Sequence, residues 1–226
     1  MLRHTKDVKG SKLNLIDGEL GKIKDFYFDD QVWTIRYLVA DTGKFLPGRE
    51  VLISPVSLGT IDEKNKTIKV NLTKEMVERS PSVISEGSLL RRDEVILSEH
   101  YNWPMYWEEI TIEVEEDIHL RSTKEVTGYR IEAIDGEIGA IGNFVIDDLS
   151  WTVRYMVVDI KKILPSRKVL LALDWIERID EVEKKIVVNV TKDRIKSAPQ
   201  YKPETSINRI IETELFDHYK KEYYWR

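Results

Sequence analysis

Apolar and β-branched residues form short clusters along the first 80 positions, and turn residues separate the clusters. Runs of this length and spacing are typical of β-strands. Asp17-Gly18 stands between the first two runs and is a strong signal for a tight hairpin. The strands expected from the pattern cover residues 11–15, 19–28, 32–40, 51–54 and 67–72.

A short helix is predicted directly after the last of these strands. Thr73 has the side chain of an N-cap residue, and Ser80-Pro81 ends the helical pattern. Other turns are expected at Asp29-Asp30-Gln31, Pro47-Gly48 and residues 62–65. Several short strands followed by one helix predict a mainly β fold. We expect a small closed barrel, since closure removes exposed strand edges.

The whole pattern then repeats without a gap. Ile16-Asp17-Gly18-Glu19 recurs as residues 134–137, an offset of 118 residues (134 − 16). The same offset carries Trp33, Arg36, Leu46, Arg49, Thr73, His100, Tyr106 and Trp107 to Trp151, Arg154, Leu164, Arg167, Thr191, His218, Tyr224 and Trp225. Such an agreement over the full length indicates an internal duplication.

Each repeat ends in a tail of a different character. Residues 88–101 predict a helix, which leads into a cluster of aromatic residues. We therefore expect a first barrel at 1–81 with its tail at 82–107, and a second barrel at 123–199 with its tail at 200–226. The acidic residues 108–122 between them are expected to be a connector, with a strand at 110–114.

Composition narrows the class of protein. The chain of 226 residues has 42% hydrophobic and 33% charged residues, which suits two globular domains with solvated surfaces. There is no cysteine, which excludes disulfides and thiolate metal sites. A net charge of −5 argues against electrostatic binding of nucleic acid over a broad surface. Neither a membrane-spanning segment nor a signal peptide is expected, so the sequence predicts a cytoplasmic protein.

Three motifs occur in order, and they occur twice. They are Asp-Gly-Glu-x-Gly, Phe-x-x-Asp-Asp and Trp-Thr-x-Arg-Tyr-x-Val, found at 17–21, 26–30 and 33–39 and again at 135–139, 144–148 and 151–157. With these motifs the chain resembles PRC-barrel domains, in a tandem two-copy arrangement. The resemblance covers nearly the whole chain.

The resemblance implies two compact six-stranded PRC-type β-barrels, each with a short helix and a partly helical aromatic tail. Related domains are the cytoplasmic domain of the photosynthetic reaction centre H subunit and the C-terminal domain of the ribosomal RNA processing factor RimM. Neither supplies a set of catalytic residues to carry over. Fold likeness alone does not fix a function.

Paired carboxylates at Asp29-Asp30 and Asp147-Asp148 are the first candidate site. Adjacent strand residues point to opposite faces, and turns favour Asp, so we interpret both pairs as turn residues. His100 and His218 are candidates for binding a metal or for transferring a proton. With four histidines and no cysteine, no spacing resembles a zinc site, and we expect both to seat neighbouring aromatic rings.

Arg36 and Arg154 lie within otherwise apolar strands, where a guanidinium needs an acceptor. A structural pair with Asp41 or Asp159 is favoured, and a clamp for an anion or a partner's carboxylate is the alternative.

The aromatic tails are the best candidates for partner binding. They contribute Trp103, Tyr106 and Trp107 in the first copy, and Tyr223, Tyr224 and Trp225 in the second. Docking onto the chain's own barrels is the first expectation, since exposed apolar patches are costly. One hypothesis is that each tail covers the barrel of the other copy. The tails are not equivalent, because Lys221-Glu222 replaces Trp103-Pro104.

No nucleophile motif, phosphate loop or dinucleotide fingerprint is present, so the sequence predicts neither an enzyme nor a cofactor. We expect a non-catalytic binding, scaffold or regulatory protein that acts through protein–protein contacts. A small-ligand or ion-binding regulator is the alternative, with Arg36 and Arg154 in its site. An accessory factor for ribosome or RNA processing is a further alternative. The sequence leaves a homo-oligomer open.

Overall fold

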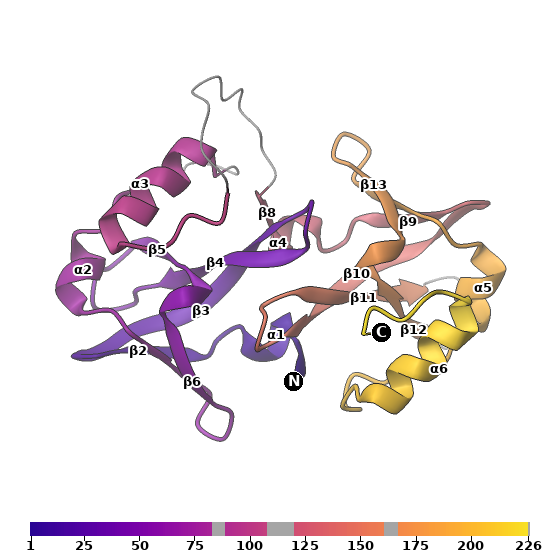
Figure 1. Cartoon of the computed structure of the whole chain (residues 1–226), viewed down its shortest axis with the longest axis horizontal. Coiled ribbons are helices and arrows are strands. Elements are labelled where there is room, and N and C mark those ends of the chain that lie inside the picture. The colour runs from indigo at the N-terminus through magenta and orange to yellow at the C-terminus, as the bar shows by residue number, and fades with distance from the viewer. Residues whose placement is uncertain (83–88, 108–119, 161–166, 226) are drawn as a thin grey trace. The chain divides into compact units, whose positions relative to one another are not determined.

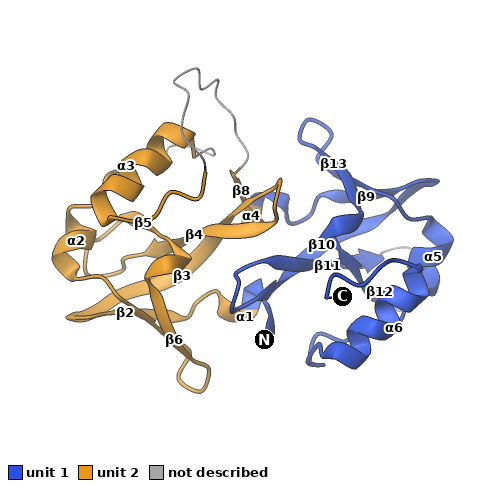
Figure 2. Cartoon of the chain, in the orientation of Figure 1, with its two compact units in different colours: residues 1–6, 125–226 blue, residues 7–124 orange. Residues whose placement is uncertain are grey.

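The computed structural model describes residues 1–82, 89–107, 120–160 and 167–225 (Figure 1). The chain forms two compact units (Figure 2). Unit 2 consists of residues 7–124, and unit 1 combines residues 1–6 with residues 125–226. These units differ from the contiguous ranges expected from the sequence, because a short segment at the start of each repeat belongs to the other unit.

Unit 2 contains one mixed sheet of seven strands. Its central path runs β5-β4-β3-β2-β7-β6, and β8 pairs with the free part of β3. The β2–β7 pair is parallel and the others are antiparallel. The strands are β2 (Lys12–Leu15), β3 (Gly18–Asp29), β4 (Thr34–Asp41), β5 (Glu50–Ile53), β6 (Leu58–Asp62), β7 (Thr67–Val70) and β8 (Leu120–Ser122).

Unit 1 repeats this arrangement, with the order β12-β11-β10-β9-β14-β13 and β1 paired with β10. Its strands are β1 (Leu2–His4), β9 (Arg130–Ala133), β10 (Gly136–Asp147), β11 (Val153–Ile160), β12 (Arg167–Ala172), β13 (Ile176–Asp180) and β14 (Lys185–Val188). The helices in the described residues are α1 (Thr5–Val8), η1 (Pro55–Ser57), α2 (Lys74–Glu78), α3 (Arg91–Tyr101), α4 (Thr123–Val126), η2 (Leu173–Trp175), α5 (Lys192–Ser197) and α6 (Arg209–Tyr219).

The mainly β fold in two equivalent units is confirmed, but the sheets are not closed barrels. In the described residues of each unit the sheet path ends at β5 and β6, or at β12 and β13, which do not pair with each other. The short 3-10 helix η1 or η2 connects these end strands and turns the chain between them. Ser57 accepts a backbone hydrogen bond from Asn71 just beyond β7, and Trp175 accepts one from Asn189.

The hairpin and helix signals act together. The side chain of Thr73 accepts from the Met76 backbone N–H and so caps α2, as predicted. Asp17, at the hairpin turn, accepts a hydrogen bond from the Lys74 N–H at 2.9 Å. Gly18 follows with a φ of 149°, a backbone conformation that side chains disfavour. The repeated Asp-Gly motif therefore makes the turn and orders the helix start.

The first strand of each repeat is exchanged. Leu2, Arg3 and His4 in β1 lie opposite Asp147, Ile146 and Val145 of β10. In the same way β8 lies antiparallel to residues 27–29 of β3. Figure 2 shows residues 1–6 coloured with unit 1 and β8 coloured with unit 2. Each sheet thus takes its seventh strand from the other repeat.

The aromatic tails, in contrast, stay with their own repeats. Helix α3 packs in unit 2, where Trp103 donates to Ser57 at 2.6 Å. Helix α6 packs in unit 1, where Phe216 lies 5.4 Å from the Trp175 ring. The hypothesis that each tail covers the other copy is therefore wrong: the strands are exchanged and the tails are not. The strand expected at 110–114 lies outside the described residues.

Candidate functional site

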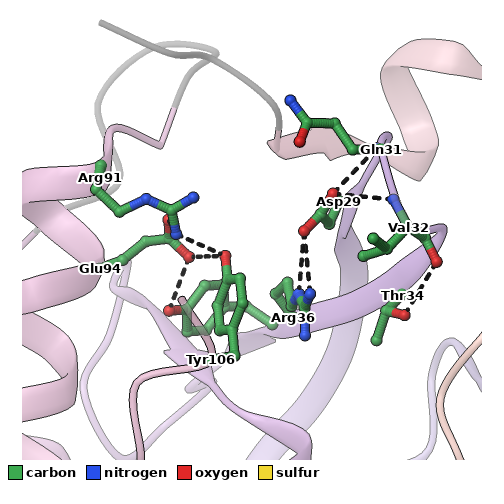
Figure 3. A network of polar contacts seen from close by, with 9 residues as sticks. Asp29, Gln31, Val32, Thr34, Arg36, Arg91, Glu94 and Tyr106 are labelled. Carbon is green, nitrogen blue, oxygen red and sulfur yellow. Dashed lines mark hydrogen bonds and ion pairs between the residues drawn. The ribbon is translucent and has the colours of Figure 1, made fainter. Parts of the chain in front are cut away.

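Unit 2 contains a fully buried carboxylate, that of Glu94 on α3 (Figure 3). One of its oxygens, Oε1, accepts from the hydroxyl of Tyr106 at 2.5 Å and from that of Tyr37 at 3.2 Å. The other, Oε2, accepts from Arg91 at 2.8 Å. A buried carboxylate needs this number of donors, because an unpaired one is expensive. The cluster ties the tail to strand β4.

Arg36 joins the same cluster from β4. Its guanidinium lies 3.5 Å from the centre of the Tyr106 ring, and its Nη2 donates to Asp29 at 3.1 Å. The structural pairing expected for Arg36 is thus made with Asp29, and the expected partner Asp41 was wrong. Asp41 instead accepts from the backbone N–H of Gly43. Arg36 serves a cation–π contact and an ion pair at once.

Unit 1 reproduces the cluster on α6. The hydroxyls of Tyr155 and Tyr224 each donate to Oε1 of the buried Glu212 at 2.7 Å. Arg209 lies 3.1 Å from Oε2 of this carboxylate. Arg154 lies 4.3 Å from the Tyr224 ring centre. We call these two groups the Tyr–Glu clusters. They are formed by Tyr37, Glu94, Arg91, Arg36, Tyr106 and Trp107, and by Tyr155, Glu212, Arg209, Arg154, Tyr224 and Trp225.

Burial raises the pKa of Tyr37 far above its usual value, and the negative charge of Glu94 raises it further. The same causes, in the same order, raise the pKa of Tyr106. In unit 1 burial and the hydrogen bond to Glu212 raise the pKa of Tyr155. The hydroxyls of these tyrosines therefore stay protonated even above the usual pKa of tyrosine, and each can donate a hydrogen bond to its buried glutamate.

Two donors in the clusters are buried without a hydrogen-bond partner among the described residues: Trp107 Nε1 and Arg154 Nε. Arg154 differs from Arg36 because the carboxylate equivalent to Asp29, Asp147, faces the N-terminal ammonium group at 3.6 Å. The partner expected for Arg154, Asp159, instead pairs with Lys168, so that expectation was wrong. Buried donors without a hydrogen-bond partner are uncommon in native proteins, so these two atoms of the Tyr–Glu clusters require an explanation.

His100 and His218 lie beside the tails. Their Nε2 atoms are 2.8 Å from the carbonyl oxygens of Met76 and Arg194. Each ring also meets the next tyrosine of its helix edge-on, His100 with Tyr101 at 4.6 Å. These contacts fit the expected seating of aromatic rings. In the described part of the chain, no group of three or more His, Asp or Glu side chains is placed to hold a metal.

The unequal tails have a simple packing reason. In unit 2 Trp103 stacks on Tyr101, with ring centres 4.3 Å apart, and donates to Ser57. Offset by 118 residues, Trp103 becomes Lys221 and Ser57 becomes Trp175. Trp175 lies 4.4 Å from Tyr219, the counterpart of Tyr101. Both units place an indole beside this tyrosine, one from the tail and one from the 3-10 helix.

In each Asp-Asp pair the first residue stabilises the turn and the second forms an ion pair. Asp29 makes the expected turn, accepting from the backbone N–H of Gln31 at 3.0 Å. Asp30 instead forms an ion pair with Arg121 of the exchanged strand β8. Unit 1 does the same: Asp147 accepts from the Leu149 N–H, and Asp148 pairs with Arg3 and with the N-terminal ammonium group. The second Asp of each pair is therefore an anchor for an exchanged strand.

Asp25 is a further anchor for β8 and α4, buried in unit 2. It lies 2.7 Å from Lys9 Nζ, accepts from Thr123 at 2.6 Å, and accepts from Ser122. Burial raises the pKa of Asp25, but the hydrogen bonds from Lys9, Ser122 and Thr123 outweigh it, so the pKa lies below its usual value. The counterpart in unit 1 is the neutral Asn143, which accepts from Thr5 at 2.7 Å.

Unit 2 is therefore expected to lose stability in acid through Asp25. Below about pH 4 the unfolded carboxylate takes up a proton before the folded one does, so the free energy of unfolding falls as pH decreases through the folded pKa. Asp25→Asn should lower the stability of unit 2 by about 1–3 kcal/mol at pH 7 and make its pH dependence shallower. Urea unfolding at pH 7 and about pH 3.5 measures both effects. Equal pH slopes in the two proteins would contradict this role for Asp25.

Sequence reasoning missed Glu94 and Glu212, Tyr37 and Tyr155, and Arg91 and Arg209. A glutamate on a helix rich in charge reads as exposed. The signal that could have found it is spacing: Glu94 stands with Leu97, Ser98 and Tyr101 on the buried face of α3. The identity of all six residues across the 118-residue offset was a second signal.

The structure so far defines a mainly β protein with two equivalent units, each with a helical tail fastened by a buried carboxylate. Among the described helices the longest, α3 and α6, have 11 residues, and none is long and apolar enough to cross a membrane. Residues 6–77 match the family model of the PRC-barrel domain. The first repeat therefore contains a PRC-barrel domain. No curated protein matches the chain.

Proposed function

We propose that this protein is a non-catalytic, cytoplasmic scaffold that binds protein partners through the outer faces of its two Tyr–Glu clusters. The family of the first repeat supports a binding or scaffold role in general. The observation that carries the finer proposal is the rigid aromatic–guanidinium surface. Tyr106 is 36% exposed although its hydroxyl is held by the fully buried Glu94.

Rigid tyrosine, tryptophan and arginine side chains are the groups that dominate protein–protein binding energy. In unit 2 the Arg91 guanidinium lies 4.4 Å from the Trp107 ring centre, beside the Arg36–Tyr106 stack. In unit 1 Arg209 lies 4.1 Å from the Trp225 ring centre. Because these side chains are already ordered, a partner loses little of its binding energy to fixing them. Two such surfaces give one chain two equivalent binding sites.

The proposal is tested by replacing Trp107 and Trp225 together with alanine. A specific partner, identified by cross-linking to the clusters of the full-length protein, should bind at least about 30-fold more weakly, since each hot-spot residue is worth about 2 kcal/mol or more. Isothermal titration with the purified partner measures the change. Val182→Ala is the matched control, because this side chain is 91% exposed and lies outside both clusters.

Partner affinity that is the same in the double variant and in the native protein would overturn the proposal. A ligand-binding regulator is the second candidate, favoured by the buried Arg154 Nε without a partner among the described residues. Native mass spectrometry of the native protein and Arg154→Ala separates the two. A small molecule or anion retained only by the native protein would favour that second function.

A further inference from the structure

Unit 2 contains a cavity of about 640 Å³ between the start of β3 and the loop that follows β4. Its lining consists of Glu19, Leu20, Gly21, Lys22, Asp41, Thr42, Gly43, Lys44 and Phe45. None of these residues belongs to a Tyr–Glu cluster. A volume of this size is typical of pockets that bind small organic molecules. The cavity is therefore a candidate ligand site apart from the surfaces proposed for protein partners.

The loop on one side of the cavity is fixed by its own hydrogen bonds. Thr42 is 1% exposed, and its hydroxyl oxygen lies 2.6 Å from the carbonyl oxygen of Leu46 and 2.7 Å from that of Arg49. The Phe45 N–H donates to the Thr42 carbonyl oxygen at 3.0 Å. Gly43 has a φ of 56°, and a Cβ at this position would have no atom within 4 Å. Because the loop is already ordered, a ligand loses little binding energy to fixing it.

The apolar part of the lining is formed by Leu20 and Phe45. Leu20 is fully buried, and Phe45 is half-buried. Gly21 lies next to Leu20, where a Cβ would come within 1.9 Å of the Asp41 carbonyl oxygen, so no larger residue fits between the two strands. The Lys74 ammonium group lies 5.6 Å from the ring centre of Phe45 and adds a positive charge beside the ring. This side of the cavity suits a flat apolar group that carries a negative charge.

Positive charge in the cavity is less well neutralised than negative charge. Glu19 lies 3.6 Å from Lys12 Nζ, and Asp41 accepts a backbone hydrogen bond at 2.9 Å. Lys22 lies opposite Asp41 in the β3–β4 ladder, but neither Lys22 nor Lys44 forms an ion pair with a described residue. Lysine binds phosphate as a point charge. The charges therefore favour an anionic ligand.

The second repeat lacks the groups that give this cavity its character. Offset by 118 residues, Lys22 becomes Ala140. The same offset replaces Phe45 with Ile163. A cation and a flat ring are thus missing together from the sequence of the second repeat. The ligand site belongs to unit 2, and the second repeat supplies the residues for a test.

We propose that this cavity binds a small organic phosphate that carries a flat ring. The ring packs against Phe45, and the ammonium groups of Lys22 and Lys44 bind the phosphate. Lys74 adds a third positive charge from the side of the ring. The site goes beyond the proposed scaffold function, because it gives unit 2 a ligand of its own.

The test titrates 1-naphthyl phosphate into the full chain by isothermal titration calorimetry. The expected dissociation constant is about 1 mM or lower, given the size of the probe. Inorganic phosphate and 1-naphthol each supply one half of this chemistry and should bind at least about 10-fold more weakly. 1-Naphthoate has one negative charge in place of nearly two and should bind at least about 3-fold more weakly. Equal binding of 1-naphthoate, or no binding of 1-naphthyl phosphate up to about 10 mM, overturns the proposal.

The variant for this test combines Lys22→Ala with Phe45→Ile, which places the residues of the second repeat in the cavity. Its affinity for 1-naphthyl phosphate should fall at least about 10-fold. Lys64→Ala is the matched control, because it removes an exposed positive charge from the β6–β7 turn. Its affinity should stay within about twofold of the native value. A double variant that binds like the native protein, or an equal loss in Lys64→Ala, contradicts the proposed site.

Nuclear magnetic resonance of the ¹⁵N-labelled native protein locates the probe without any substitution. On addition of 1-naphthyl phosphate, the amide signals of residues 19–22 and 41–45 should shift in a saturable manner. Signals of residues 134–148 in unit 1 should stay in place. Shifts confined to residues outside the cavity lining rule out the proposal, whatever the stability of the double variant.

Discussion

Replacing Glu94 with alanine is expected to lower the free energy of unfolding of unit 2 by about 3–5 kcal/mol. The change leaves the Tyr37 hydroxyl buried without its acceptor and removes the counter-charge from Arg91. Glu94→Gln should cost less, about 1–3 kcal/mol, because an amide oxygen still accepts from the two tyrosines. Urea unfolding gives the size of the loss, and hydrogen exchange by mass spectrometry assigns it to unit 2.

The matched control for this prediction is Glu99→Ala on the same helix. Glu99 is exposed, and a surface change of this kind is expected to stay within about 0.5 kcal/mol of the native protein. Glu212→Ala in unit 1 should reproduce the loss of Glu94→Ala in the other unit. If Glu94→Ala were as mild as Glu99→Ala, the Tyr–Glu cluster would not hold the tail in place.

Replacing Trp103 with lysine, the residue that stands there in the second repeat, should cost unit 2 about 3–5 kcal/mol. The indole is 9% exposed, and its loss leaves a cavity beside Tyr101 and an unpaired Ser57 hydroxyl. Adding Ser57→Trp to this variant rebuilds the arrangement of unit 1, where Trp175 occupies the corresponding position. The second change is therefore expected to recover about 1–3 kcal/mol, as neighbouring residues that share one site do.

A double-mutant cycle in urea measures this coupling. The four proteins are the native chain, Trp103→Lys, Ser57→Trp and the double variant, and Met105→Ala serves as an exposed tail control. Additive losses from the two substitutions would show that the indoles of Trp103 and Trp175 do not replace each other. A positive coupling would show that an indole from the tail and an indole from the 3-10 helix can fill the same space beside the tyrosine.

Much of the fold could be predicted, because it depends on local patterns. Asp17-Gly18 predicts its hairpin, and Thr73 predicts the start of α2, since turn and capping preferences are set by neighbouring residues. The duplication was readable because 118 residues separate every pair of matched positions. The open sheets were not predicted. Closure depends on whether β5 and β6 approach each other, and no local pattern determines that.

The exchange of strands could not be predicted for a related reason. A strand of three residues such as Leu2–His4 has too few positions to show an alternating pattern, and both β3 and β10 offer it the same Asp-Asp edge. The buried glutamates were hidden by their charge. Glu94 is stabilised by hydroxyls from β4 and from the end of the tail, which come together only in the folded unit.

The crossing of the two short strands has a consequence for how the chain is made on the ribosome. The edge of β3 at residues 27–29 must wait for residues 120–122 to emerge, and β1 must wait until residues 145–147 have followed. Neither sheet can be finished while only the first repeat has been synthesised, although domains usually fold one after another during translation. The nascent first repeat therefore has an unpaired strand edge. Until the second repeat has been synthesised, this edge can pair with another chain and aggregate.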